Sequence, residues 1–289
     1  MSTTTSTPTS TSAGRSAMSV RTRLGALHVR IVGSGPVTVL WPSMFVDGHT
    51  WDRLLPHLAA DRRYVLVDGP GLGRSEPLRR RSSIGEAADA AVDLLDGLGV
   101  DAPVDWVGNA FGGHVGFDLA TREGVLRSLV AVSAPTEPIT PELRRQIALL
   151  APVLRLAGAV RPVRDSVVEA MLTQASAADP QLRAVVVDSL RRPGRRSLSL
   201  ALRSFILDRA DVNDTLGDIR VPSLFVASDD RGDWSPQDAV RAAALTPAAR
   251  AVVVDGARTL VPLEQPVTLA RLLRDFWAEV DGSEAPHPR

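Results

Sequence analysis

Short apolar runs alternate with amphipathic stretches along most of this 289-residue chain. Apolar runs rich in β-branched side chains and bounded by Gly, Pro or Asp predict buried strands. Stretches between them with apolar residues every three or four positions predict helices that cover a sheet. The alternation predicts an α/β fold with a mostly parallel sheet and helices on both faces. The expected strands are Arg21–Leu24, Leu27–Val32, Val37–Trp41, Tyr64–Val67, Val104–Val107, Leu126–Ser133, Ser223–Ser228 and Ala251–Val254.

Expected helices follow several of these strands. One begins near Thr50 as a possible N-cap, and three others cover Ile84–Leu98, Pro236–Leu245 and Pro266–Val280. The alternation stops within residues 136–215, where prolines separate several helical segments. Ala184–Val187 resembles a strand, but it lies inside a longer helical pattern and is interpreted as helix.

These patterns predict three parts. Residues 1–17 are nearly all Ser, Thr, Pro and small residues, which is typical of a disordered tail. Residues 18–135 and 216–282 form the α/β core. Residues 136–215 form a helical cap over the carboxyl edge of the sheet.

The most informative stretch runs from Val104 to Gly116, where an apolar run turns over a glycine-flanked residue into a glycine-rich helix start. This is the context of the nucleophile elbow, Gly-x-Ser-x-Gly, which holds a serine hydroxyl above a parallel sheet. Here the elbow residue is Ala110. Because a methyl group cannot act as a nucleophile, the motif indicates a fold and removes the usual chemistry of that fold.

Four landmarks in order resemble the α/β-hydrolase superfamily, in particular its helical-cap esterases, epoxide hydrolases and C–C hydrolases. They are the turn at Leu40–Ser43, the Asp-x-x-Gly-x-Gly-x-Ser turn at Asp68–Ser75, the elbow at Gly108–Gly113 and the loop Gly256–Pro266. The resemblance extends from about Val20 to Val280. It implies an α/β-hydrolase fold with a pocket at the carboxyl edge of the sheet.

The resemblance also implies where a Ser-His-Asp triad would lie, and those positions have lost it. The nucleophile position is Ala110 and the histidine position is Thr259. The acid position is Arg231, or Asp230 if the count slips by one residue, and Asp233 is also near. Several losses together favour a lineage that stopped using the triad over an engineered inactivation. Enzymes stripped of triad members keep only about 10³–10⁴-fold rate enhancement, so we expect no ordinary serine-hydrolase activity.

The loss of the triad side chains does not remove the backbone N–H groups that form the oxyanion hole in the family. In the family the oxyanion hole uses the N–H after the elbow residue, here Phe111, and one from the first loop, here Ser43. We expect the pocket to be lined by cap residues and by Ser43, Met44, Phe45, Phe111 and Trp234. Such a pocket suits a small hydrophobic compound with a carbonyl group.

Among the five histidines, His49 is the acid–base candidate, with Asp47 two residues before it. The alternative interpretation of His49 is a loop histidine beside a helix N-terminus. His114, one turn past Ala110, is interpreted as a core histidine.

Three functions therefore remain open. The first is an enzyme without the triad that isomerises, eliminates or cyclises its substrate, using His49, Asp47 or Asp230 for proton transfer. The second is a non-catalytic ligand-binding or scaffold protein. The third is a hydrolase with Asp47 or Asp68 as nucleophile.

Composition excludes several other classes. The 33 basic residues are all arginines and balance 33 acidic ones, so neither a lysine Schiff base nor a Walker phosphate loop is possible, and nucleic-acid binding is not expected. There is no cysteine and no metal-ligand spacing, so the sequence predicts neither a metal site nor a cofactor. No apolar run has the length of a membrane span, and the expected location is cytoplasmic. The oligomeric state is left undetermined.

Overall fold

The computed structural model describes residues 15–209, 211–230 and 234–284. Within them, eight strands form one sheet in the order β1-β2-β4-β3-β5-β6-β7-β8. β1 pairs with β2 and β2 with β4 in antiparallel fashion, and the other pairs are parallel. The predicted mostly parallel α/β sheet is confirmed. Its strands are β1 (Arg15–Thr22), β2 (Gly25–Gly33), β3 (Val37–Trp41), β4 (Arg63–Val67), β5 (Val104–Asn109), β6 (Leu126–Val132), β7 (Ser223–Ser228) and β8 (Ala249–Val254).

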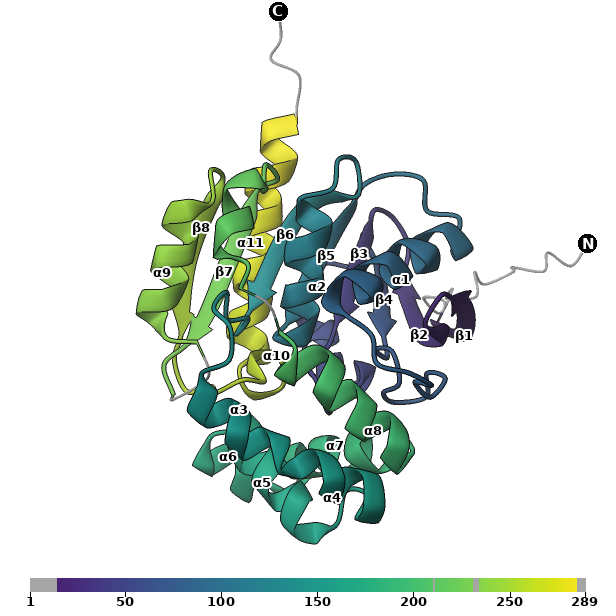
Figure 1. Ribbon diagram of the computed structural model, residues 1–289. Coiled ribbons are helices and arrows are strands. Elements are labelled where there is room, and N and C mark those ends of the chain that lie inside the picture. Colours follow the sequence, from purple (N-terminus) through teal and green to yellow (C-terminus); the bar gives the residue numbers. More distant parts are fainter. Residues whose placement is uncertain (1–14, 210, 231–233, 285–289) are drawn as a thin grey trace, which may run out of the picture.

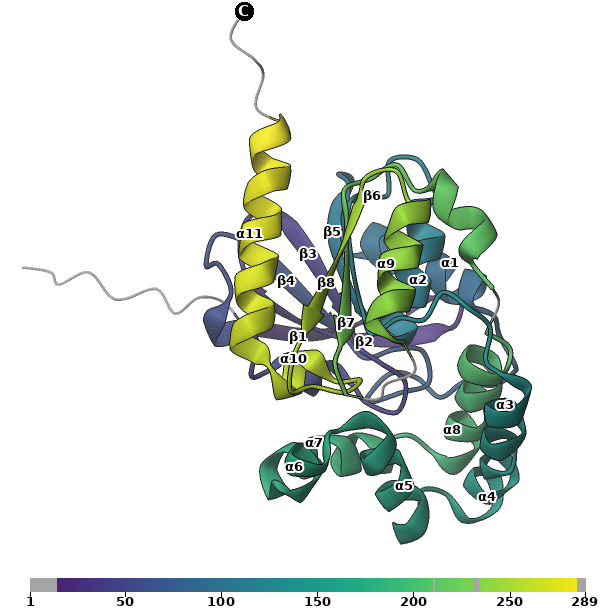
Figure 2. The same ribbon diagram turned by 90° about the vertical axis from the view of Figure 1, so that its left-hand side faces the viewer.

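Helices cover both faces of the sheet, as Figure 2 shows. One face carries α1 (Ile84–Gly97), α2 (Phe111–Ala120) and α9 (Pro236–Leu245), and the other carries α11 (Pro266–Glu284). Because side chains alternate along a strand, neighbouring residues enter different cores. Trp106 packs in the core beneath α1 and α2, whereas Val107 packs with Trp277 of α11.

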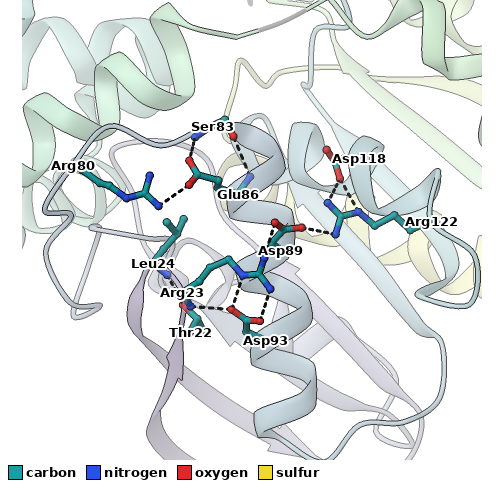
Figure 3. Close-up of polar contacts among 10 residues, drawn as sticks. All are labelled: Thr22, Arg23, Leu24, Arg80, Ser83, Glu86, Asp89, Asp93, Asp118 and Arg122. Atoms are coloured by element: carbon teal, nitrogen blue, oxygen red, sulfur yellow. Dashed lines mark hydrogen bonds and ion pairs between the residues drawn. The ribbon is translucent and has the colours of Figure 1, made fainter.

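Charged side chains join α1 to its neighbours, as Figure 3 shows. Arg23, in the turn between β1 and β2, pairs with Asp89 and Asp93 of α1 at 2.7 and 2.9 Å. Arg122 joins Asp89 to Asp118 of α2. Because these pairs are partly exposed to water, each adds little to stability.

A second group of charges centres on Asp105, near the start of the central strand β5. The Asp105 carboxylate of β5 is fully buried and pairs with Arg62 and Arg127, while both arginines also reach Asp281 of α11. The Arg62 guanidinium lies 4.5 Å from the ring centre of Trp277. The group connects β5, β6 and α11.

The chain leaves the sheet after β6 and returns at β7, and in between it forms a block of helices beyond the carboxyl ends of these strands (Figure 1). Ala184–Val187 lies inside α7, as predicted. The block comprises α3 (Pro141–Ala148), α4 (Leu150–Ala157), α5 (Arg161–Met171), α6 (Gln174–Ala178), α7 (Pro180–Arg191), α8 (Arg195–Leu202) and the π-helical turn η3 (Arg203–Leu207). The 3₁₀ helix η4 (Asn213–Asp218) is not part of it, because it packs beside α9 and leads into the start of β7.

Three expectations about local structure are wrong. β1 already begins at Arg15, so residues 15–17 of the expected tail belong to a strand. The strand expected at Arg21–Leu24 contains the end of β1 and a turn, because the two strands form a hairpin. The helix expected from Thr50 consists of two 3₁₀ turns, η1 (Gly48–Trp51) and η2 (Leu55–His57), and the N-cap of η1 is Asp47. A short helix, α10 (Val261–Glu264), precedes α11.

Candidate functional site

The predicted elbow is present at the junction of β5 and α2. Ala110 has φ 45° and ψ −102°, a conformation that non-glycine residues rarely adopt. The bend needs its glycines because a Cβ at Gly108 would lie 2.1 Å from the Gly112 carbonyl oxygen, and one at Gly112 would lie 2.2 Å from that of Trp41. The sharp turn therefore requires glycine at both positions, and Ala110 lies at its tip.

A cavity of about 420 Å³ lies over this elbow. Residues from the core and from the helical block share its wall, and most of them are apolar. The wall is lined by Ser43, Met44, Phe45, Ala110, Phe111, His114, Ser133, Pro135, Leu143, Ile147, Leu150, Ser166, Val167, Ala170, Met171, Phe205, Ile206, Arg209, Arg258 and Thr259.

Backbone strain is concentrated at this cavity. Among the described residues, Phe45, Ala110 and Ser133 are the non-glycine residues with positive φ, at 66°, 45° and 47°. All three line the cavity. Each such conformation costs on the order of 1–3 kcal/mol, and it is typically retained where a binding or active site requires it. The clustering therefore marks the cavity as the candidate site.

Two backbone donors face no acceptor within the described chain. The N–H groups of Ser43 and Phe111 make no hydrogen bond there, and both residues line the cavity. Phe111 is also the first residue of α2, where the helix N-terminus favours negative charge. The two groups have the chemistry needed to bind a carbonyl oxygen.

The triad positions hold no acid–base pair in the described residues. Thr259 lines the cavity, and its carbonyl oxygen accepts a hydrogen bond of 2.8 Å from the Asn109 side chain. Asp230 pairs with Arg258 at 3.1 Å. Arg231 and Asp233 lie outside the described residues.

The structure brings His49 and Asp47 together, but neither is among the described residues that line the cavity. His49 Nδ1 lies 2.9 Å from Asp47 Oδ1, and the other carboxylate oxygen pairs with Arg192 at the end of α7. Burial alone would raise the pKa of Asp47. Hydrogen bonds from His49 and the charge of Arg192 outweigh burial and lower the pKa to about 2. Asp47 therefore serves as an ionised anchor between the η1 loop and the helical block.

Asp68, like Asp47, is a buried carboxylate held by hydrogen bonds. The backbone N–H groups of Gly48 and Arg74 each donate to its carboxylate at 2.8 Å, and it is 3% exposed. Burial raises the pKa of Asp68, and the nearby charge of Asp47 raises it further. Asp68 is not among the described residues on the cavity wall, so its position does not favour a role as nucleophile.

His114 is buried, in agreement with its interpretation as a core histidine, but it also lines the cavity, which the sequence reasoning missed. Its Nε2 lies 2.8 Å from the carbonyl oxygen of Pro135. Because a carbonyl oxygen can only accept, Nε2 carries the proton and Nδ1 is a hydrogen-bond acceptor. Nδ1 is buried and has no partner in the described residues. Burial and the charge of Arg209 lower the pKa of His114 to about 3, so the ring is neutral at physiological pH.

Trp234 does not line the cavity, contrary to the prediction from the sequence. Its ring is 2% exposed and packs in the core against Phe225, with 6.1 Å between ring centres, and it is not among the described residues on the cavity wall. Ser43, Met44, Phe45 and Phe111 do lie on that wall. No cluster of His, Asp or Glu within the described chain has the arrangement of a metal site. In the same part of the chain, no helix is long and apolar enough to cross a membrane.

Parts of the chain are similar in sequence to two bacterial enzymes. A 2-hydroxymuconate semialdehyde hydrolase of Pseudomonas sp. strain CF600 is 37% identical over 117 residues, covering 39% of this chain and 38% of that protein. A 2-heptyl-3-hydroxy-4(1H)-quinolone dioxygenase of Mycobacteroides abscessus is 34% identical over 116 residues, covering 40% of this chain and 42% of that protein. The chain thus spans about two fifths of the length of either relative.

A solved structure agrees with the fold over a longer stretch. The enol-lactonase of Burkholderia xenovorans LB400 superposes with a TM-score of 0.81 at 21% identity, covering 90% of this chain and all of that one. The model of the alpha/beta hydrolase family matches residues 38–272, which contain both the elbow and the cavity wall. The chain belongs to the alpha/beta hydrolase family.

Proposed function

We propose that this protein is a non-hydrolytic member of the family that binds a small hydrophobic carbonyl compound and isomerises, eliminates or cyclises it. One observation carries the proposal: the N–H groups of Ser43 and Phe111 lack acceptors on an apolar cavity wall beside the strained Ala110. Donors held in place before the ligand arrives stabilise negative charge that develops on its oxygen. An enolate or a related oxyanion is the species that these reactions share.

The chemistry of Ala110 and Thr259 supports the non-hydrolytic part of the proposal. Ala110 has no nucleophilic atom, so it cannot form an acyl intermediate. Thr259 stands at the family's histidine position and cannot act as the general base. One relative carries the name of a dioxygenase, so reactions other than hydrolysis occur among proteins similar to this one.

A second candidate is a ligand-binding protein without catalysis. It is favoured by the location of the expected acid–base pair, because His49 and Asp47 are absent from the described wall of the cavity. His114 is on that wall, but a group with a pKa of about 3 is a weak base. Both candidates use the same cavity and differ only in turnover.

The test uses phenylacetone, an enolisable hydrophobic ketone, in D₂O. Binding is followed by saturation-transfer NMR and catalysis by loss of the α-proton signals. Ala170→Trp fills the cavity wall and should abolish both signals, whereas Ala244→Trp on the outside of α9 should change neither. Binding with faster exchange supports the enzyme, and binding alone supports the second candidate. Lack of binding by the native chain would contradict both for this ligand class.

His49→Ala decides the role of the Asp47–His49 pair in the same assay. Exchange lost with binding retained would assign proton transfer to His49. Unchanged exchange would leave it as the structural partner of Asp47.

A further inference from the structure

The outer side of the helical block carries an apolar ridge formed by Leu149, Val153 and Leu156. Their exposed fractions are 72%, 38% and 73%. The spacing of four and three residues places the three side chains on one face of a helix. The other large hydrophobic residues that are exposed in the described chain are spread over β1, β8, α9 and α11. A contiguous exposed apolar group of this kind is typical of a contact surface.

The local sequence explains why the ridge is held in place. Pro152 has no N–H to donate to the carbonyl of Ala148, so the helix is interrupted and α4 begins at Leu150. Leu149 keeps helical angles, φ −66° and ψ −22°, across the interruption. On the opposite side of α4, Ala151 and Leu154 are fully buried, which anchors the helix with its ridge outward.

Exposed arginines lie near the ridge along the chain, and one more contacts its end. The side chains of Arg145 and Arg161 are 80% and 87% exposed, and Arg155 is also exposed. Arg195 donates a 2.9 Å hydrogen bond to the carbonyl oxygen of Leu156. The acidic groups paired with these arginines are Glu142, 3.9 Å from Arg145, and Asp165, 3.7 Å from Arg161. An apolar strip with arginines near it matches an anionic lipid surface, in which apolar side chains enter the headgroup region and cations meet phosphates.

The helix that carries the ridge also forms part of the cavity wall. Figures 1 and 2 place α4 at the edge of the helical block away from the sheet, free to meet a flat surface. Leu143, Ile147 and Leu150 of the same pair of helices line the cavity. Three side chains are far fewer than the roughly 20–30 residues on each side of a stable protein interface. A bilayer therefore fits the ridge better than a second copy of the chain does.

We propose that the apolar ridge of α4 docks this protein on anionic phospholipid, with the cavity directly behind the docking helices. The test is co-sedimentation of the full chain with vesicles of phosphatidylcholine, alone or mixed with phosphatidylglycerol. The native chain should bind the mixed vesicles and bind phosphatidylcholine more weakly. The double variant Leu149→Ser/Leu156→Ser should lower binding at least about tenfold, because it removes apolar area that enters the membrane.

Matched controls separate docking from a general loss of surface hydrophobicity. Val240→Ser/Val267→Ser removes valines that are 58% and 61% exposed on α9 and α11, and binding should stay unchanged. Arg155→Gln should weaken binding to the mixed vesicles and leave binding to phosphatidylcholine vesicles unchanged. Equal binding by the native chain and the ridge variant would overturn the proposal. A dimer in light scattering that the ridge variant abolishes would also overturn it and assign the ridge to a second copy.

Discussion

The ring of Phe205 stacks on the ring of Phe111, with 4.5 Å between their centres and 25° between their planes. Phe205 belongs to the π-helical turn η3 of the helical block, and Phe111 follows the elbow residue of the core. Both rings are almost fully buried, and both residues line the cavity. The stack therefore joins the helical block to the core at the point where the ligand oxygen is proposed to bind.

Phe205→Ala should destabilise the protein by about 3–5 kcal/mol, because it removes a buried aromatic ring and leaves a void beside Phe111. Urea unfolding measures the change in the free energy of unfolding. Phe205→Leu keeps part of the contact and should give a smaller loss. A loss below about 1 kcal/mol for Phe205→Ala would mean that the helical block is not held through this stack.

Asp105→Asn should cost about 3–5 kcal/mol, because it removes the carboxylate that neutralises the buried Arg62. Arg127 loses the same ion-pair partner. Asp93→Asn is the matched control on the surface. Its partner Arg23 is 48% exposed, so the loss should stay below about 1 kcal/mol. Equal losses in urea unfolding would contradict the importance of burial at Asp105.

The sheet and the elbow follow from short-range rules that can be read in the sequence. Strands such as Leu126–Val132 are apolar on both faces because helices cover both faces, and this leaves a continuous run. The glycines around Ala110 are required by contacts within a few residues, such as that between Gly108 and Gly112. The position of Ala110 at the bend could therefore be predicted.

The cavity wall depends on contacts between distant residues, which periodicity does not specify. Asp47 is turned toward Arg192, a partner 145 residues away in the helical block, and His49 stays with Asp47. Trp234 packs on Phe225 instead of reaching the cavity. The sequence did contain a signal for His114, since a residue one turn after Ala110 lies on the same side of α2 as the elbow.

His114 should make stability depend on pH. Its folded pKa of about 3 lies below its ordinary value of 6.5, so below pH 6.5 the unfolded chain binds a proton that the folded chain does not. The free energy of unfolding should therefore fall with decreasing pH, by up to about 1.4 kcal/mol per pH unit. Urea unfolding at intervals from pH 7.5 to 5 measures the slope.

Two variants identify the source of this slope. His114→Gln should reduce it between pH 6.5 and 5, because glutamine does not titrate. Part of the slope should remain, because burial also lowers the pKa of His28. His57→Gln alters an exposed histidine and should leave the slope unchanged. If His114→Gln kept the native slope, the neutral state assigned to His114 would be wrong.

Restoring the nucleophile alone should not restore hydrolysis. Ala110→Ser places a hydroxyl at the elbow, but no base occupies the family's histidine position, so turnover of p-nitrophenyl acetate should remain near the uncatalysed rate. Ala110→Ser/Thr259→His adds an imidazole on the same cavity wall and should raise turnover at least about 100-fold over the single variant, the lower end of general-base effects. Ala110→Ser/Thr121→His, with its histidine at the exposed end of α2, should match the single variant. If Ala110→Ser alone turned over the ester as fast as the double variant with Thr259→His, another group of the native chain would be serving as the base, and the proposed loss of hydrolytic chemistry would be refuted.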